Sequence, residues 1–169
     1  MTVFRRANPA DIPDIMRLVR EAQAFMRTLH IDQWQDGYPG RDVLERDIEL
    51  GQLYVFAGED AVAAIGALTL LPEPAYEKLV GRWLSDGPYL TIHRMALDDA
   101  HRGGGLAAEL LAQAERLARE GGCASVRIDT HRGNLAMRRF VEKHGFVRTG
   151  EHLGEVGHYL CDVLYIKDL

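Results

Sequence analysis

The residues best suited to chemistry lie in one glycine-rich stretch between an expected strand and an expected helix. It reads His101-Arg102-Gly103-Gly104-Gly105-Leu106-Ala107-Ala108. Glycines let the backbone approach a ligand closely, and the unpaired amides at a helix start, with the positive end of its dipole, attract anions. Arg102 adds a positive charge. The stretch therefore predicts a pyrophosphate-binding turn, although a flexible connection without a ligand is an equally common use of such glycines.

A second phosphate-binding pattern overlaps this stretch. Gly103-x-Gly105-x-x-Ala108 fits the fingerprint of dinucleotide-binding folds, and Asp129 ends the next expected strand at about the place of a ribose-binding acid. Two features oppose this interpretation: residues 98–102 separate the strand from the glycines, and only 40 residues follow Asp129, too few for a doubly wound sheet. An NAD(P)-dependent oxidoreductase is therefore the less favoured alternative.

Length and composition indicate the class of protein. The chain has 169 residues, of which 47% are hydrophobic and 27% charged, and this is typical of one folded domain over residues 1–169. A formal net charge of −5 argues against general nucleic-acid binding, because a phosphate backbone is held by a basic face. No signal peptide, long apolar run, P-loop or zinc-site spacing of histidines occurs. We therefore expect a cytoplasmic protein without membrane contact or a metal.

The pattern of apolar residues predicts one mixed, mostly antiparallel central sheet. Asn8-Pro9 followed by Asp11 is typical of a helix start. Periodicity and glycine breaks predict helices over 12–29, 43–50, 104–120 and 134–144, and strands over 3–6, 53–57, 61–71, 89–97, 125–130, 146–152 and 158–166. About seven strands and four helices belong to the α/β or α+β class. Exposed edge strands near the C-terminus also make a homodimer a reasonable expectation.

At this point the sequence resembles the GCN5-related N-acetyltransferase (GNAT) family. The pyrophosphate motif of that family is Arg or Gln, two residues, Gly, one residue, then Gly or Ala, and Arg102, Gly105 and Ala107 match it. Residues 95–97 resemble the splayed strand whose amides hold the pantetheine arm, and residues 134–146 resemble the second conserved helix. The resemblance implies a GNAT-like single domain with acetyl-CoA as co-substrate, bound by Met95, Ala96, Leu97, Arg102, Gly103, Gly104, Gly105, Leu106, Ala107 and Asn134.

Transfer of an acetyl group from a thioester to an amine requires a base, a stabilised oxyanion and a proton for the thiolate. If the strand splays at residues 95–97, as the resemblance implies, a backbone amide there can donate to the carbonyl oxygen. His93 titrates in the range of a base, although a partly buried structural histidine is a more common role. The family often has a tyrosine seven residues after the helix asparagine, but here that residue is Val141. Tyr159 is the candidate acid instead.

The acceptor is less defined than the cofactor. Gln33, Trp34 and Tyr38 follow the first helix, and large aromatics with a polar edge suit a small amine, although Trp34 is equally suited to the core. The resemblance implies an N-acetyltransferase that acts on a primary amine of a small molecule, protein or peptide. A non-catalytic acyl-CoA-binding module is the alternative, which Val141 makes credible.

Overall fold

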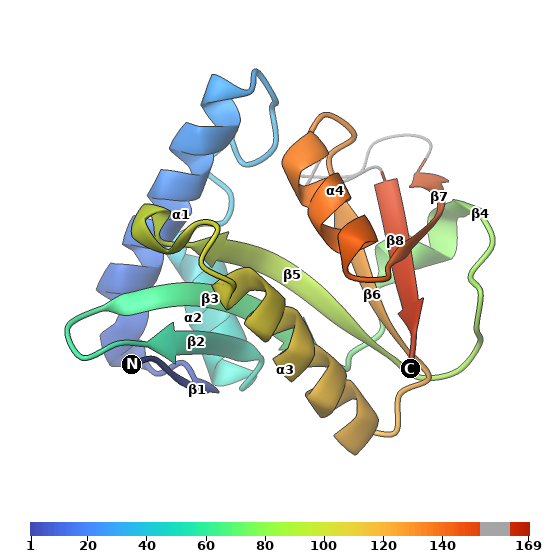
Figure 1. Cartoon of the computed structure of the whole chain (residues 1–169), viewed down its shortest axis with the longest axis horizontal. Helices are drawn as coiled ribbons and strands as arrows, with labels where there is room; N and C mark the ends of the chain where they lie inside the picture. The colour runs from blue at the N-terminus through green and yellow to red at the C-terminus, as the bar shows by residue number, and fades with distance from the viewer. Residues whose placement is uncertain (153–162) are drawn as a thin grey trace.

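The structure is a computed structural model, and it describes residues 1–152 and 163–169 (Figure 1). Eight strands form one sheet in the order β1-β2-β3-β5-β6-β8-β7-β4. The strands are β1 Val3–Arg6, β2 Leu53–Ala57, β3 Val62–Thr69, β4 Leu79–Gly81, β5 Tyr89–Leu97, β6 Ser125–Thr130, β7 Val147–His152 and β8 Val163–Asp168. The helices are α1 Ile12–Thr28, α2 Arg41–Glu49, α3 Leu106–Glu120 and α4 Leu135–Lys143. The predicted class and the four helices are confirmed.

The centre of the sheet opens between β5 and β6. These two strands pair in parallel from Tyr89 with Ser125 to Ile92 with Ile128, and the ladder ends there. Beyond Ile92, β5 stays paired with β3, but two of its residues, Arg94 and Met95, oppose one residue of β3. Such a bulge bends a strand and increases its twist. β5 therefore diverges from β6, as Figure 1 shows, and the backbone of residues 93–97 has no ladder on the β6 side among the described residues.

Helices cover the two faces of the sheet. α1 and α2 pack on one face, where Ile15, Leu18 and Leu44 meet Val55 and Ile65 in a buried cluster. α3 and α4 pack on the other face, in a second cluster that contains Leu110, Leu111 and Val141 with Ile92 and Ile128 of the central strands. The apolar stripe of α1 predicted from its three- and four-residue spacing is thus the buried face of this helix. No helix in the described ranges has the length and apolar character needed to cross a bilayer.

Residues 70–88, here called the strap, cross the sheet face over β5 and β6. The strap contains a 3₁₀ helix over Pro74–Lys78 and the short strand β4, which pairs with β7. The sequence analysis missed this eighth strand, because three residues are too few to show alternation. The strap is held by Arg127 of β6, whose guanidinium lies 4.0 Å from the ring centre of Trp83 and 3.9 Å from that of Tyr89.

The C-terminal strands lie inside the sheet, which corrects one expectation. β8 pairs with β6 and β7, and β7 pairs with β8 and β4, so neither of them is an edge strand. The reason given for a homodimer, exposed C-terminal edges, is therefore wrong, and the homodimer itself stays a prediction. The predicted last strand began at residue 158, and its first five residues lie outside the described residues.

Candidate active site

The glycine-rich loop connects β5 to α3 through one 3₁₀ turn, Asp99–His101. Gly103 and Gly105 have φ angles of 76° and 89°, and a Cβ atom at either residue would have no other atom within 4 Å. These residues therefore keep a left-handed backbone with open space in front of it, which suits a close ligand. Gly105 is the N-cap residue of α3, so the unpaired amides of the first helical turn lie at this loop. Binding of pyrophosphate here stays a prediction.

Arg102 lies against α1 at the edge of this loop. Its Nε is 2.6 Å from Oδ1 of Asp99, and its guanidinium carbon is 4.1 Å from the ring centre of Phe25. A guanidinium over an aromatic face is attracted by the ring quadrupole. The predicted phosphate-binding arginine is thus positioned by a residue of α1 that the sequence analysis did not identify.

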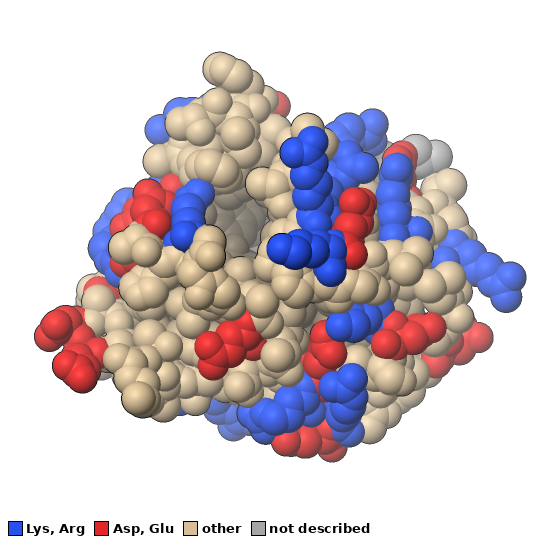
Figure 2. Space-filling model, viewed as in Figure 1, with Lys and Arg blue, Asp and Glu red and all other residues tan. Residues whose placement is uncertain are grey.

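A cleft of about 320 Å³ follows the divergent part of β5, between α1 and α4. Figure 2 shows a hollow on this face, with Lys and Arg side chains gathered over α4. Seven of the predicted cofactor residues line the cleft: Met95, Ala96, Leu97, Arg102, Gly103, Ala107 and Asn134. Leu106 does not, because its side chain packs in the core against the sheet. Its predicted role in cofactor binding, through its backbone amide, stays a prediction. Gly104 and Gly105 also fall outside the lining.

Asn134 begins α4 and lies at the inner end of the cleft. Its side-chain Oδ1 accepts a hydrogen bond of 3.1 Å from the amide of Met137, which caps the helix. Val141, where the family often has a tyrosine, is fully buried and lines neither the cleft nor the cavity next to it. Met137 and Phe140 are the α4 side chains that face the cleft. At position 141, α4 therefore has no tyrosine hydroxyl of the kind that the family often has there.

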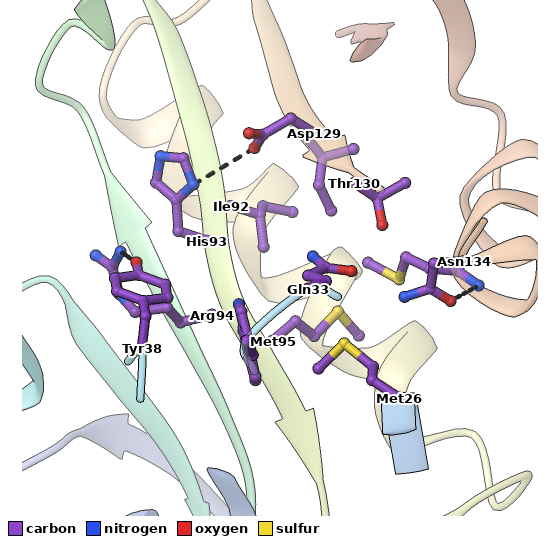
Figure 3. Close-up of a pocket in the computed structure, with 13 residues that line it drawn as sticks. Met26, Gln33, Tyr38, Ile92, His93, Arg94, Met95, Asp129, Thr130 and Asn134 are labelled. Atoms are coloured by element: carbon purple, nitrogen blue, oxygen red, sulfur yellow. Dashed lines mark hydrogen bonds and ion pairs between the residues drawn. The ribbon is translucent and has the colours of Figure 1, made fainter. Parts of the chain in front are cut away.

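A smaller cavity of about 80 Å³ continues from the cleft (Figure 3). Met26, Met95, Asn134 and Met137 line both spaces. The three predicted acceptor residues, Gln33, Trp34 and Tyr38, line the cavity and come together there with His93. Trp34 is also buried in the hydrophobic core, which is the second role that the sequence suggested for it. The centres of the Trp34 and Tyr38 rings are 6.5 Å apart, with the rings edge to face.

His93 lies between two carboxylates at one end of the cavity. Its Nε2 is 3.1 Å from Oε2 of Glu73 in the strap, and its Nδ1 is 3.5 Å from Oδ1 of Asp129 on β6. The hydroxyl of Tyr76 donates a hydrogen bond of 3.0 Å to the same Asp129 oxygen. Figure 3 shows His93 and Asp129 facing each other across the gap between β5 and β6.

These contacts change the protonation expected for His93. Burial disfavours the charged ring, but the hydrogen bonds to Asp129 and Glu73 outweigh it and raise the pKa of His93 to about 9. The bond to His93 in turn lowers the pKa of Glu73 below its ordinary value. The expectation that His93 titrates near neutral pH is therefore wrong. At pH 7 the ring is an imidazolium, which has no lone pair to accept a proton.

A second charged pair lies near Tyr38, and its cation, Arg94, lines the cavity. Arg94, at the β5 bulge with a φ of 52°, donates to both oxygens of Asp47 in α2, at 2.6 and 2.9 Å. Its remaining terminal nitrogen donates to the hydroxyl of Tyr38 at 2.6 Å. Both members of the ion pair are buried. The sequence analysis did not identify Asp47 or Glu73, because nothing in the local pattern marks a carboxylate that becomes functional through a distant partner.

Two predictions for the site remain outside this geometry. Tyr159 lies outside the described residues, so its role as an acid stays a prediction. The dinucleotide-binding interpretation is wrong, because the described strands pair antiparallel except for β5 and β6, whereas a doubly wound fold requires a parallel sheet. Asp129, assigned in that interpretation to a ribose, belongs to the His93 cluster instead.

Comparisons with known proteins agree with this geometry. The model of the acetyltransferase (GNAT) family matches residues 17–146. A GNAT-family acetyltransferase from Streptococcus agalactiae 2603 has a crystal structure that is 32% identical over 99% of this chain and 95% of that chain, with a TM-score of 0.85. One from Listeria monocytogenes 4b F2365 is 26% identical over the same shares, with a TM-score of 0.75.

A more distant structure shares the fold. PaiA N-acetyltransferase from Thermoplasma acidophilum, in complex with coenzyme A, is 15% identical over 100% of this chain and 99% of that chain, with a TM-score of 0.74. A comparison with curated proteins gave no match. The family model covers well over half of the chain, and it includes α3, the glycine-rich loop and the diverging strands. The chain therefore belongs to the GNAT family of acetyltransferases.

Proposed function

We propose that this acetyltransferase binds acetyl-CoA in the cleft and transfers the acetyl group to the primary amine of a small molecule held in the adjoining cavity. One observation carries the proposal. The cleft beside the glycine-rich loop and the cavity with the carboxylates meet at Met26, Met95, Asn134 and Met137, next to the point where β5 leaves β6. A thioester at this junction would face an amine in the cavity.

The cofactor is supported by the two ends of the cleft. At one end, the amides of the first turn of α3 and the Arg102 guanidinium suit a pyrophosphate. At the other end, the backbone of residues 95–97 has no ladder toward β6, so its polar groups are available to an amide-containing arm such as pantetheine. The complex of the Thermoplasma protein with coenzyme A is consistent with this assignment.

The chemistry follows from the groups at the junction. The amine nitrogen attacks the thioester carbonyl, an N–C bond forms, and the C–S bond breaks with the electron pair leaving on sulfur. A backbone amide among residues 95–97 donates to the oxyanion. An acceptor that arrives as an ammonium first loses one proton to solvent, and the proton released when the N–C bond forms passes to Asp129, because His93 is already protonated. The thiolate takes a proton from Tyr159 or leaves as the anion, since a thiol with a pKa of about 8.5 is a good leaving group.

A small acceptor is supported by the size of the cavity. A space of about 80 Å³ closed by Trp34, Tyr38 and Gln33 suits a small amine better than a folded protein surface. The non-catalytic module rests on Val141, whereas the buried charged cluster of Glu73, His93 and Asp129 next to the cleft supports catalysis.

Two measurements test the proposal. Thermal unfolding is recorded with acetyl-CoA and, separately, with NAD; a ligand at 100 times its Kd adds roughly 2.7 kcal/mol of stability, and we expect this with acetyl-CoA alone. Release of free thiol from acetyl-CoA is then followed with a panel of primary amines. Stabilisation by acetyl-CoA without thiol release on any amine would support a binding module and contradict acetyl transfer to a small amine.

A further inference from the structure

Among the described residues, the charged side chains that line the cavity and the partners behind them carry together an excess of negative charge; the lining ones are His93, Arg94 and Asp129, and the partners are Asp47 and Glu73. Arg94 and Asp47 form a buried bidentate pair and cancel each other. At the opposite end, the carboxylates of Glu73 and Asp129 flank one imidazolium, His93. Two anions against one cation leave one negative charge unbalanced, in a space where little water screens it.

The cations of the cavity are already engaged. The three guanidinium nitrogens of Arg94 each donate to Asp47 or to the Tyr38 hydroxyl. The two ring nitrogens of His93 each face a carboxylate, Glu73 or Asp129. A carboxylate on the acceptor would therefore enter a site in which each of these two cations already has a carboxylate counter-ion. Like charges placed together inside a binding site cost several kcal/mol.

Asp129 is the group that an ammonium would meet. Its Oδ1 is shared by the Tyr76 hydroxyl and by His93. Both of these contacts fall on Oδ1 and not on Oδ2, and the residue lines the cavity. A carboxylate oxygen of this kind accepts a charge-assisted hydrogen bond from a cationic amine. The walls beside it, Trp34 and Tyr38, are aromatic and suit an apolar body.

We propose that the acceptor is a small cationic amine with no carboxylate next to its amino group, so that amines and amino-acid amides are substrates and free amino acids are discriminated against. The inference rests on the proposed acetyl transfer to a small amine and adds the charge of the acceptor to it. The negative charge of Asp129 determines this selectivity.

The test uses two matched series. One consists of isobutylamine, valinamide and valine, and the other of 2-phenylethylamine, phenylalaninamide and phenylalanine. The amide has nearly the same size as the acid but lacks its charge. The two also differ in the pKa of the amino group, and this difference is the same for every protein variant, so the change in their kcat/KM ratio between variants isolates the effect of the carboxylate on the site. Wild type, Asp129→Asn and the control Asp60→Asn, an exposed carboxylate in the β2–β3 turn, are compared. Each variant must first match the wild type in acetyl-CoA binding, which shows that it is folded.

We expect the wild type and Asp60→Asn to prefer the amide over the acid by at least about tenfold, as repulsion of a few kcal/mol implies. Because Asp129→Asn also lacks the proposed proton acceptor, amide and acid are compared for this variant and the wild type by their dissociation constants in calorimetry as well; the preference for the amide should be clearly smaller in Asp129→Asn, because the excess charge is gone. Equal use of acid and amide by the wild type, or an unchanged ratio in Asp129→Asn, would overturn the inference and leave acetyl transfer intact. Binding of acetyl-CoA without turnover of any compound would overturn the proposed function, and this inference with it.

Discussion

The Nδ1 atom of His93 lies 3.5 Å from Oδ1 of Asp129, across the gap that opens where β5 leaves β6. These strands are joined by a ladder only up to Ile92 and Ile128, one residue before each member of the pair. The ion pair thus replaces the backbone contact at the first position where the sheet divides. The same divergence opens the cleft and brings a buried cation and anion to one end of the cavity.

The charge of His93 should make stability depend on pH. Its pKa is raised from the ordinary value of 6.5 to about 9. A raised pKa stabilises the fold fully below pH 6.5, and this stabilisation is lost as the pH rises through 9. A shift of this size corresponds to about 3 kcal/mol. Urea unfolding between pH 6 and 10 should show this loss in the wild type and a flatter profile in His93→Gln. Parallel profiles would mean that His93 is neutral in the folded protein.

Arg102 and Phe25 should act together on acetyl-CoA. Arg102→Ala removes a charge-assisted contact to phosphate and should weaken acetyl-CoA binding by on the order of tenfold or more. Phe25→Leu keeps apolar bulk but removes the ring under the guanidinium, so it should weaken binding by a few-fold. In the double variant the two losses should not add. Arg116→Ala, an exposed arginine on α3, is the control for loss of charge. Additive losses would show that Phe25 does not position Arg102.

Gly105 should be required for cofactor binding beyond its effect on stability. Its φ of 89° is unfavourable for a residue with a Cβ, and Gly105→Ala should cost about 1 kcal/mol. Gly122→Ala is the matched control, because Gly122 has a φ of 70°, equally open surroundings and a place at the far end of α3. Both variants should lose similar stability in urea, but Gly105→Ala should also weaken acetyl-CoA binding in calorimetry. Equal affinity for acetyl-CoA in the two variants would argue against the loop as the pyrophosphate site.

The buried pair of Arg94 and Asp47 should be needed for folding. Asp47→Asn leaves the Arg94 charge buried without its counter-ion, and breaking such a pair typically costs about 3–5 kcal/mol. Glu45→Gln removes an exposed carboxylate on the same helix, paired with Arg41, and should change stability by less than about 0.5 kcal/mol. Urea unfolding of the three proteins measures both effects. A loss below 1 kcal/mol in Asp47→Asn would mean that water reaches Arg94 freely.

Arg127 should influence the acceptor through the strap. It packs between Trp83 and Tyr89, and the strap carries Glu73 and Tyr76 to the His93 cluster. Arg127→Met loses two cation–π contacts, worth about 0.5–2 kcal/mol each. We expect lower stability and a raised KM for the amine, with little change in acetyl-CoA affinity. Arg127→Lys keeps the charge and should restore part of the KM effect. Equal changes in amine KM and acetyl-CoA affinity would indicate a general loss of structure instead.

The sequence by itself determined most of the elements and the place of the glycine-rich loop. Periodicity located α1, and the predicted bounds of residues 89–97 and 125–130 are those of β5 and β6. The glycine-rich stretch was placed correctly between strand and helix, because glycine φ preferences and helix capping act over a few residues. The family motif at Arg102, Gly105 and Ala107 is likewise formed by residues that are close together in the chain. Side chains within one turn or one strand define these features, so a single sequence can report them.

Only the tertiary structure decided how the acceptor site is charged. Glu73, His93 and Asp129 come from the strap, β5 and β6, and none of the local patterns around them indicates that they meet. The protonation of His93, which sequence reasoning assigned near neutrality, depends on both carboxylates and on burial. β4 was missed for a related reason, since a three-residue strand is stabilised by its partner β7 and not by its own sequence. Electrostatic and pairing energies depend on distances between segments far apart in the chain, and only the folded molecule sets those distances.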